Sequence, residues 1–446
     1  MSKAIKTKFS QRSKRAVVHV LGCKVNQAEA AVMAHLLEMR GYAVDASFKD
    51  PDLVLVNTCC VTSRAESKSR RLIGKLTRTF PTAQLIVTGC LAEVSPCALD
   101  RFTGKLKILG TFDKDRFDQF LAGELLPGPE SKQRGASYSS QFADLGVPDT
   151  LGRARTYLKV QDGCSQCCSY CVVPLARGPS RSLVLGRAIS HAQALKEAGS
   201  AEIVLTGIHL GSYGRDLNPP LRLEDLLESV VQECSEVRFR MSSIEPQDIT
   251  PRLIELAGGH PSICRHFHIP VQSGDDSVLK RMGRPYDAAF IRDLTARILR
   301  NIPEACVGFD LMVGFPGEDE DAFQKTLDLA RDSGAAYLHV FPFSPRPGTP
   351  AASFGSRVPA TVARHRVNEL RMLSENLRKR FFERSVGKTF KVVLESGPDL
   401  ITRSLVARTD NYIPVRVKTE MSPLTGKVFH VILEKIVGGE VLGIYV

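Results

Sequence analysis

Short apolar runs alternate with helix-like stretches along residues 16–128. The runs VVHVLGC, DLVLVNTCC and AQLIVTGC have the composition of buried strands, and each ends in a cysteine. Alternating units of this kind form a parallel sheet, and ligands bind at the carboxyl ends of its strands. The pattern predicts an N-terminal parallel α/β domain that brings Cys23, Cys59 and Cys90 to one sheet edge. The alternative is three structural thiols, although such thiols more often lie inside a strand.

Apolar runs also alternate with amphipathic segments along residues 150–384, and EDAFQKTLDLAR is one such amphipathic segment. Six units are visible, fewer than a closed (β/α)8 barrel needs. We therefore expect an open, partial (β/α)6 barrel whose catalytic residues gather at the strand C-termini. The expected strands are Tyr157–Gln161, Glu202–Thr206, Val237–Ser243, Phe267–Val271, Val307–Val313 and Tyr337–Phe341.

The last region, residues 385–446, contains only short strand-like runs separated by turns, from TFKVVLES to VFHVILEKIVGGEVLGIYV. Several short strands in a segment of this size predict a small closed β-barrel. The chain as a whole is therefore expected to be an α/β protein with a C-terminal β-barrel.

The net charge of +12 is concentrated toward the two ends of the chain. Residues 1–15 form a basic tail with six basic side chains and no acidic one. A second basic run, Arg378, Lys379 and Arg380, precedes the C-terminal region. Basic ends around a near-neutral body indicate arms that grip a polyanion such as RNA. A solvated tail and a solvated helix face are the alternative.

The apolar runs are all too short to span a bilayer, and no signal-peptide-like stretch follows the basic N-terminus. We therefore expect a soluble, cytoplasmic protein without a membrane partner. Thiols stay reduced in that compartment, so clustered cysteines are more often metal ligands than disulfides.

Residues 163–171 read GCSQCCSYC, with four cysteines in nine positions. A zinc site usually takes two cysteine pairs separated by a dozen or more residues, which this segment lacks. The spacing Cys164-x3-Cys168-x2-Cys171 places three thiolates on one short loop. Three ligands suit a 4Fe–4S cube whose fourth iron is open to a substrate. Cys167 is then the surplus thiol.

This spacing, placed after the first barrel strand and with Tyr170 before its last cysteine, resembles the radical S-adenosylmethionine (SAM) superfamily. The segments LGCKVNQAE, VNTCCVT, VTGC, QDGCSQCCSYCVVPLARG, IVLTGIHLG, FHIPVQSG and VGFPGE resemble the methylthiotransferases within it. The similarity covers about residues 15–446, and LGCKVN with NTCCVT is most like the MtaB branch. Two surplus thiols, Cys60 and Cys167, depart from the family pattern.

The resemblance implies an N-terminal methylthiotransferase domain, a radical SAM core and a C-terminal RNA-binding TRAM barrel. It implies two 4Fe–4S clusters, one on Cys164, Cys168 and Cys171 and the other on Cys23, Cys59 and Cys90. It also implies two SAM molecules per turnover. One supplies a radical that abstracts hydrogen from an adenine carbon, and the other methylates the inserted sulfur.

The implied reaction is methylthiolation of N6-threonylcarbamoyladenosine next to the anticodon of tRNA. The alternatives are an aspartate of a ribosomal protein, isopentenyl-adenosine in tRNA, and a non-enzymatic iron–sulfur RNA-binding protein. The implied partners are tRNA and a low-potential electron donor such as flavodoxin or ferredoxin; the sequence does not identify the sulfur donor.

Further candidates follow from their places at strand ends. Tyr170 and Gly207 are candidates to contact SAM, and Glu245 and Gln272 to contact SAM or substrate, with ordinary loop structure as the alternative. Arg177 and Arg181 are candidates to meet RNA phosphate or the SAM carboxylate. The RNA-binding candidates are Arg177, Arg181, Arg378, Lys379 and Arg380.

Overall fold

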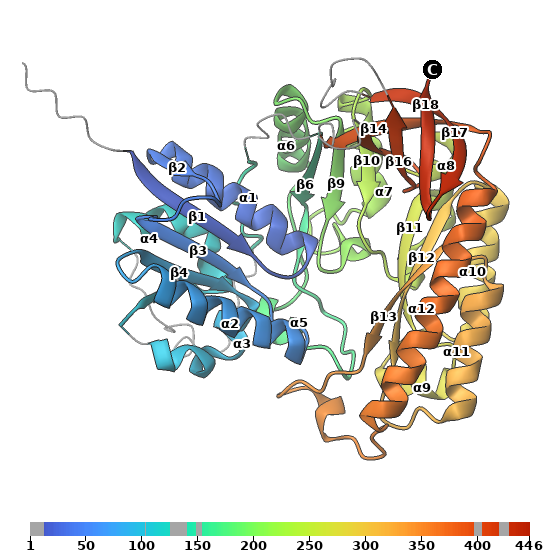
Figure 1. Cartoon of the computed structure of the whole chain (residues 1–446), viewed down its shortest axis with the longest axis horizontal. Helices are drawn as coiled ribbons and strands as arrows, with labels where there is room; N and C mark the ends of the chain where they lie inside the picture. Colours follow the sequence, from blue (N-terminus) through green and yellow to red (C-terminus); the bar gives the residue numbers. More distant parts are fainter. Residues whose placement is uncertain (1–12, 103, 125–140, 149–153, 397–403, 419–427) are drawn as a thin grey trace, which may run out of the picture.

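The protein was analysed as a computed structural model, which describes residues 13–102, 104–124, 141–148, 154–396, 404–418 and 428–446. Most of the predicted basic tail, residues 1–12, lies outside this described part. A parallel α/β domain, a partial barrel and a small β-barrel follow one another along the chain (Figure 1). No helix in the described residues combines the length and the apolar character needed to cross a membrane.

The N-terminal domain is a five-stranded parallel sheet in the order β2-β1-β3-β4-β5, as predicted. Its central strand β3 is buried along its whole length, as expected for a parallel sheet covered on both faces. Helices α1 and α4 pack on one face and helix α2 on the other. The strands are β1 (Lys14–Val20), β2 (Tyr42–Val44), β3 (Leu53–Thr58), β4 (Gln84–Gly89) and β5 (Leu106–Ile108). The helices are α1 (Lys24–Met39), α2 (Ser63–Thr79), α3 (Cys90–Val94) and α4 (Phe117–Ala122).

The partial barrel contains the six expected strands in chain order, all parallel. Two three-stranded sheets are joined by the bridges Phe239–Ile263 and Ser243–His268. The outer strands, β6 and β13, do not pair with each other, so the barrel is open as predicted. The strands are β6 (Arg155–Lys159), β9 (Glu202–Thr206), β10 (Arg238–Met241), β11 (His266–Gln272), β12 (Cys306–Val313) and β13 (Tyr337–Pro342).

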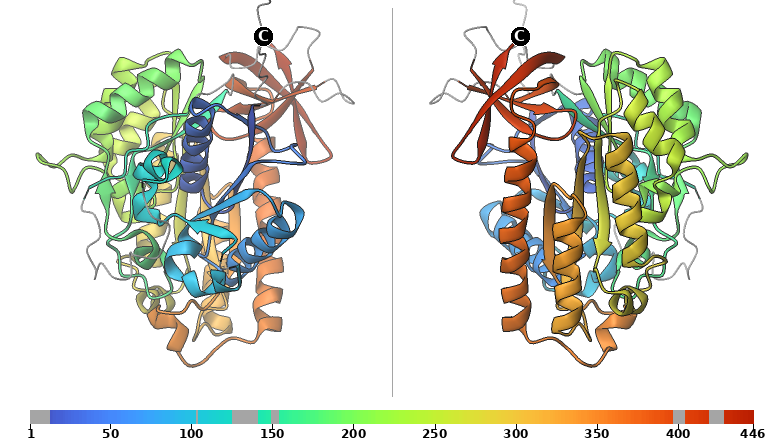
Figure 2. Two further views of the ribbon diagram at one scale, coloured as in Figure 1. Left: turned by 90° about the vertical axis from the view of Figure 1, so that its left-hand side faces the viewer. Right: turned by 90° about the vertical axis from the view of Figure 1, so that its right-hand side faces the viewer.

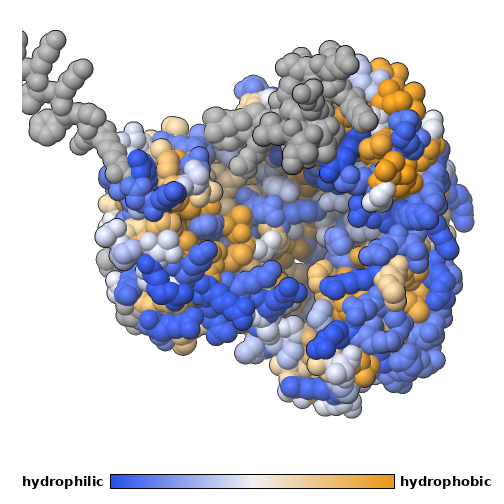
Figure 3. All heavy atoms as spheres, viewed as in Figure 1, coloured by the Kyte–Doolittle hydropathy of each residue, from blue (hydrophilic) through white to orange (hydrophobic). Residues whose placement is uncertain are grey.

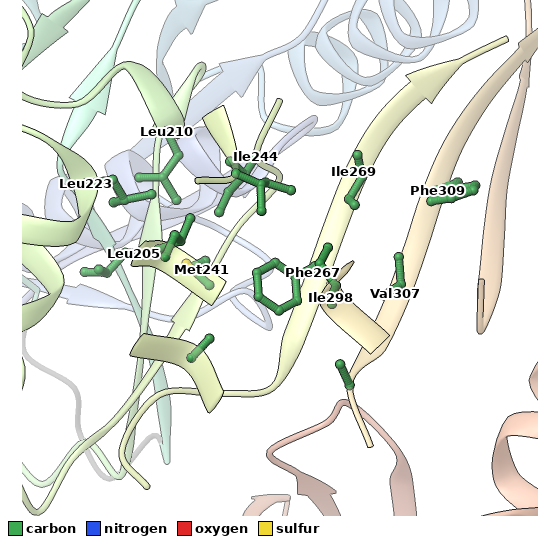
Figure 4. Close-up of a cluster of buried hydrophobic side chains, with 14 of the residues drawn as sticks. Leu205, Leu210, Leu223, Met241, Ile244, Phe267, Ile269, Ile298, Val307 and Phe309 are labelled. Atoms are coloured by element: carbon green, nitrogen blue, oxygen red, sulfur yellow. The ribbon is translucent and has the colours of Figure 1, made fainter. Parts of the chain in front are cut away.

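Helices cover the outside of this barrel, and the apolar core lies between them and the strands. Phe267 and Ile269 on β11 and Val307 on β12 face Ile298 of an outer helix (Figure 4). A short ribbon of β7 (Gln161–Asp162) and β8 (Arg181–Ser182), which was not predicted, flanks the four-cysteine loop. The helices are α5 (Val173–Arg177), α6 (Leu185–Glu197), α7 (Leu223–Glu233), α8 (Pro251–Gly259), α9 (Asp276–Met282), α10 (Ala288–Asn301), α11 (Glu320–Asp332) and α12 (Ala360–Glu383).

The C-terminal strands close into a small barrel, as predicted, in the order β14-β15-β16-β18-β17. This barrel docks at the starts of the partial-barrel strands, where α12 ends (Figure 2). Arg238 and Arg240 donate hydrogen bonds to its backbone carbonyls, while Glu202 pairs with both guanidinium groups. The strands are β14 (Thr389–Ser396), β15 (Ser404–Thr409), β16 (Pro414–Lys418), β17 (Val428–Val437) and β18 (Glu440–Tyr445).

A buried ion-pair network joins the N-terminal domain to the partial barrel. Arg177 Nη1 lies 2.9 Å from both Glu29 Oε1 and Asp162 Oδ1, and its side chain is fully buried. Lys114 Nζ lies 2.5 Å from Glu29 Oε2, and Lys159 Nζ lies 3.2 Å from Glu29 Oε1. Burial opposes ionisation of Glu29, but Arg177, Lys114 and Lys159 outweigh it and hold the pKa of this carboxyl well below its usual value. The network is therefore charged and spans the domain interface.

Removing one member of this network should destabilise the protein strongly. We expect Arg177→Met to lower the free energy of unfolding by about 3–5 kcal/mol, because two buried carboxylates lose their main partner. The matched control is Arg252→Met, whose pairs with Asp225 and Glu228 are exposed and should contribute little to stability, because water screens them. Urea denaturation followed by circular dichroism measures both, and equal midpoint shifts would contradict this prediction.

Candidate active site

The four-cysteine loop leaves the partial barrel immediately after β7 and is tied to its surroundings by backbone hydrogen bonds. Gly163 opens the loop with a φ of 70°, and a Cβ there would lie 2.0 Å from Pro179 O, so only glycine fits. The amide of Cys164 donates to Gly178 O at 3.0 Å, and the amide of Ser169 donates to Met282 O at 2.9 Å. These bonds connect the loop to the ends of α5 and α9.

The four loop cysteines differ in how far their side chains are exposed to solvent. Cys164, Cys168 and Cys171 are partly buried, whereas Cys167 is exposed. Burial raises the pKa of Cys171 to about 12, so the free thiol keeps its proton near neutral pH and a metal that binds there has to displace it. Cys167 thus differs from the other three in exposure, and its interpretation as the surplus thiol stays a prediction, because Cys23, a predicted ligand of the other set, is exposed as well.

Two basic side chains that the sequence analysis missed lie against these sulfurs. Arg284 Nη1 donates to Cys168 Sγ at 3.2 Å, and the same guanidinium pairs with Glu245. His209 Nδ1 lies 3.7 Å from Cys164 Sγ, and its Nε2 lies 2.6 Å from Asp248 Oδ2. Burial works against the imidazolium, but the bonds to Asp248 and Cys164 raise the pKa of His209 to about 9. Both groups therefore place positive charge beside the sulfur atoms of the loop.

The N-terminal cysteines also come together, because β1, β3 and β4 are neighbours in the sheet. A Cβ on Gly22, which has a φ of 103°, would lie 2.7 Å from the Cβ of Cys59. Burial first, and then Cys90 and Cys23, raise the pKa of Cys59 to about 12. Cys90 also acts to raise the pKa of Cys23, which burial raises most. The three thiols are therefore mutual neighbours, as the alternating pattern predicted.

Neither cysteine set brings three sulfur atoms as close together as the ligands of one tetrahedral ion. Within the described part of the chain, only His268, Asp310 and His339 bring three such ligand atoms within 4.8 Å of one another. Thiolates on one tetrahedral ion with bonds of about 2.3 Å would lie about 3.8 Å apart. Neither set therefore has the geometry of a preformed site for one tetrahedral ion.

Cys60 occupies a different environment from its neighbour Cys59. Its side chain is fully buried in the apolar cluster that contains Leu91 and Val172. Burial raises the pKa of the Cys60 thiol above its usual range. This is the environment of a structural thiol.

The remaining cofactor candidates lie around the loop, and their roles stay predictions. Tyr170 contacts Phe315 edge-to-face, with ring centroids 6.4 Å apart. A Cβ on Gly207 would lie 2.7 Å from Gln161 Oε1, so glycine permits that close approach. Gln272 ends β11 at a register irregularity with a φ of 71°, an uncommon conformation for a residue other than glycine.

The predicted RNA contacts of Arg177 and Arg181 are corrected by their burial. Arg177 is fully buried in the ion-pair network, and Arg181 is only 3% exposed and donates to Arg177 O at 2.8 Å. Neither guanidinium is on the surface where a phosphate binds. Arg378, Lys379 and Arg380 are exposed near the end of α12, so an RNA contact there stays a prediction.

Comparison with known proteins follows the same division of the chain. Residues 15–109 match a family described as uncharacterized protein family UPF0004, and residues 158–330 match the radical SAM superfamily. A Bacillus subtilis protein named threonylcarbamoyladenosine tRNA methylthiotransferase MtaB is 36% identical over 407 residues, covering 90% of this chain and 89% of that protein. The chain belongs to the radical SAM methylthiotransferase family. Membership implies a 4Fe–4S cluster and SAM, which the partly buried loop cysteines fit.

Other methylthiotransferases are similar over comparable lengths. The Thermotoga maritima protein with the same name is 33% identical and covers 85% of this chain and 86% of its own. A Pelotomaculum thermopropionicum protein named tRNA-2-methylthio-N(6)-dimethylallyladenosine synthase is also 33% identical, with the same coverage of both chains. The radical SAM methyltransferase TsrM from Kitasatospora setae superposes with a TM-score of 0.54 at 16% identity, covering 76% of this chain and 77% of that one. This last likeness shows a shared fold.

The loop cysteines provide a direct test of the ligand set in this methylthiotransferase. We expect Cys164→Ala, Cys168→Ala and Cys171→Ala each to lose at least about half of the loop-bound iron and all reductive SAM cleavage. Cys167→Ala should keep both, because Cys167 is the surplus thiol of the predicted ligand set. Iron analysis measures the bound iron, and quantification of 5′-deoxyadenosine measures reductive SAM cleavage. Iron loss in Cys167→Ala together with retention in Cys168→Ala would show that the assignment is wrong.

Variants of the N-terminal cysteines should give different results from variants of the loop cysteines in the same assays. Cys23→Ala, Cys59→Ala and Cys90→Ala should still cleave SAM, because the loop ligands are intact, but should form no methylthio product. Cys60→Ala is the matched control, because its buried thiol lies beside Cys59 without being an expected ligand. Loss of 5′-deoxyadenosine in all three N-terminal variants would argue against two independent sets.

Proposed function

We propose that this protein is a tRNA methylthiotransferase that modifies N6-threonylcarbamoyladenosine next to the anticodon. The observation that carries this proposal is the similarity, over 90% of the chain, to a protein whose name states that activity. The geometry of both cysteine sets supports it, since the reaction needs a site for radical formation and a site for sulfur.

We assign the second 4Fe–4S cluster to Cys23, Cys59 and Cys90. Helix α3 begins at Cys90 and packs against α5, which follows the four-cysteine loop. Arg177 at the end of α5 lies among all three N-terminal thiols, and its charge favours the thiolate forms of Cys23 and Cys59. The two cysteine sets are thus held by adjoining helices, which supports the transfer of sulfur to a substrate activated at the loop.

The side chains around the loop have distinct roles in this proposal. Bound at the loop, the cluster and SAM supply the radical that removes hydrogen from an adenine carbon. Arg284 holds the Cys168 sulfur and orients Glu245, and Asp248 holds His209 against Cys164. Tyr170 and the backbone at Gly207 line the space for SAM. Glu245 and Gln272 are placed to hydrogen-bond SAM or substrate.

We propose that tRNA is bound by the C-terminal TRAM barrel and by Arg378, Lys379 and Arg380 on α12. These three side chains are exposed, and Arg378 lies over the Phe382 ring at 5.0 Å, which leaves its charge on the surface. Such contacts release counterions, so binding should weaken as salt rises. Because tRNA is the proposed substrate, we assign the enzyme to the cytoplasm. We also expect a low-potential flavodoxin or ferredoxin to supply the electron for SAM cleavage.

A second candidate substrate is isopentenyl-adenosine in tRNA. The Pelotomaculum thermopropionicum relative, whose name states action on dimethylallyladenosine, is 33% identical to this chain. Its identity equals that of the Thermotoga maritima protein and is lower than the 36% of the Bacillus subtilis protein, and both of these proteins are named for threonylcarbamoyladenosine. The threonylcarbamoyl substrate is therefore favoured.

Reconstitution with two tRNAs tests the choice of substrate. We expect turnover of threonylcarbamoyl tRNA and turnover of isopentenyl tRNA lower by about 10⁴-fold, because an apolar substituent leaves buried polar groups of the site unpaired. Mass spectrometry of the digested nucleosides detects either product. Equal turnover, or turnover of the isopentenyl tRNA alone, would contradict the threonylcarbamoyl assignment while preserving the radical chemistry.

A further inference from the structure

Three potential metal ligands gather on the inner face of the partial barrel. His268, Asp310 and His339 lie on β11, β12 and β13, which are neighbouring parallel strands, and Asp310 is paired in register with His339. Phe267 and Ile269 face an outer helix (Figure 4). His268 stands between them in the sequence and therefore points to the inside of the barrel, because successive residues of a strand face opposite sides. We call His268, Asp310 and His339 the histidine–aspartate cluster.

The ligand atoms of this cluster lie at separations typical of atoms bound to one ion. Asp310 Oδ1 is 2.8 Å from His268 Nε2 and 3.4 Å from His339 Nδ1. Two atoms bound to one ion at about 2.0–2.1 Å are about 3.4 Å apart in tetrahedral geometry and about 2.9 Å apart in octahedral geometry. In the part of the chain that the structure describes, no other three ligand atoms of this kind lie within 4.8 Å of one another. The strands therefore hold two imidazoles and a carboxylate in place for coordination.

Hydrogen bonding explains only part of this arrangement. The 2.8 Å contact between His268 and Asp310 is an ordinary hydrogen bond. His339 Nδ1 is directed at the same oxygen from 3.4 Å, which is longer than the usual 2.7–3.2 Å of an N–H···O hydrogen bond. The third member of the cluster therefore converges on Asp310 without forming a good hydrogen bond to it.

Tyr337 fixes the orientation of His268. Its hydroxyl lies 2.8 Å from His268 Nδ1 and 2.9 Å from His266 Nε2. A hydroxyl donates one hydrogen, so when Tyr337 donates to His266 it accepts from the Nδ1–H of His268. His268 then presents the lone pair of its Nε2 toward Asp310. This is the tautomer that binds a metal, and ligating histidines usually donate their other ring N–H to a fixed partner in this way.

Gly308 provides the room for this contact. It lies between His268 and Tyr337 in the register of the three strands. A Cβ on Gly308 would lie 2.1 Å from Cζ and 2.5 Å from the hydroxyl oxygen of Tyr337. Glycine therefore lets the Tyr337 ring cross β12 and reach both histidines of β11.

Solvent reaches one side of the cluster. The side chains of His268, Asp310 and His339 are 7%, 20% and 55% exposed. The barrel is open between β6 and β13, and the surface is hollowed between the N-terminal domain and the barrel (Figure 3). The exposure of His339 gives an ion access from solvent. Three protein ligands also leave a fourth tetrahedral position for water or another oxygen ligand.

We propose that His268 Nε2, the Asp310 carboxylate and His339 Nδ1 bind one zinc ion whose fourth position is open to solvent. Two imidazoles and one carboxylate are a ligand set that zinc takes in sites with an open position. The site shares no residue with either cysteine set, so its occupancy does not require an iron–sulfur cluster. The inference goes beyond the proposed methylthiotransferase activity, and it holds whichever substrate the enzyme takes.

The test measures zinc in the full-length holoenzyme. Iron-replete protein is incubated with excess zinc chloride and desalted, and both metals are then counted. We expect wild type to retain about one zinc per chain, with nitrogen and oxygen neighbours at about 2.0–2.2 Å in X-ray absorption at the zinc edge. Sulfur neighbours at about 2.3 Å would show that the zinc occupies cysteines and would overturn the proposal.

His339→Ala should lose the zinc and keep the iron, because it removes one of three zinc ligands from an exposed position. The matched control is His365→Ala. His365 Nδ1 lies 2.8 Å from Glu369 Oε1 on α12, and this exposed pair belongs to no set of three ligands within the described residues. Zinc retention in the control is expected. Equal zinc content in wild type and iron-replete His339→Ala, or no zinc in wild type, would overturn the site.

Two further variants separate coordination from folding. Tyr337→Phe should still bind zinc, but about 10- to 100-fold more weakly in competition with a chelator, because the hydroxyl only orients His268. An unchanged affinity would show that Tyr337 has no such role. If His339→Ala loses iron as well as zinc, Asp310→Asn decides, because it keeps the shape of the side chain. Zinc loss with iron retained in Asp310→Asn would support the site, and zinc retention would overturn it.

Discussion

The buried contact between Arg177 and Glu29 fixes the relation between the two halves of the catalytic machinery. Arg177 ends the short helix that follows the four-cysteine loop, and Glu29 lies on the helix that begins after Cys23. Both side chains are removed from water, so any sliding of one domain on the other would leave a charge unpaired at a cost of several kcal/mol. Lys114 and Asp162 extend the restraint to other segments on both sides. Arg177 in this network also offsets part of the burial that raises the pKa of Cys23 and Cys59.

The sequence predicts those parts of the fold that depend on patterns among residues close together in the chain. The strands of the α/β domain and partial barrel follow from apolar runs, and the loop ligands follow from cysteine spacing within nine residues. Cys23, Cys59 and Cys90 could be brought together because the strand–helix repeat dictates a common sheet edge. Their agreement with the structure has a physical cause, since burial and strand direction alone determine these positions.

Residues with distant partners could not be predicted in the same way. Arg177 and Glu29 are 148 positions apart, and Arg284 and Cys168 are 116 apart. An arginine after a cysteine loop has the same sequence signal whether it faces RNA or a buried carboxylate, so Arg177 was assigned to the wrong environment.

The long helix α12 has a consequence for the size of the substrate. Its 24 residues span about 36 Å, from the region beside the four-cysteine loop to the C-terminal barrel. Because the exposed basic side chains lie near the far end of α12, a molecule must be about this long to contact both the four-cysteine loop and these side chains. The arrangement therefore favours a long substrate. A free modified nucleoside reaches only one of the two regions and lacks the contacts of the other.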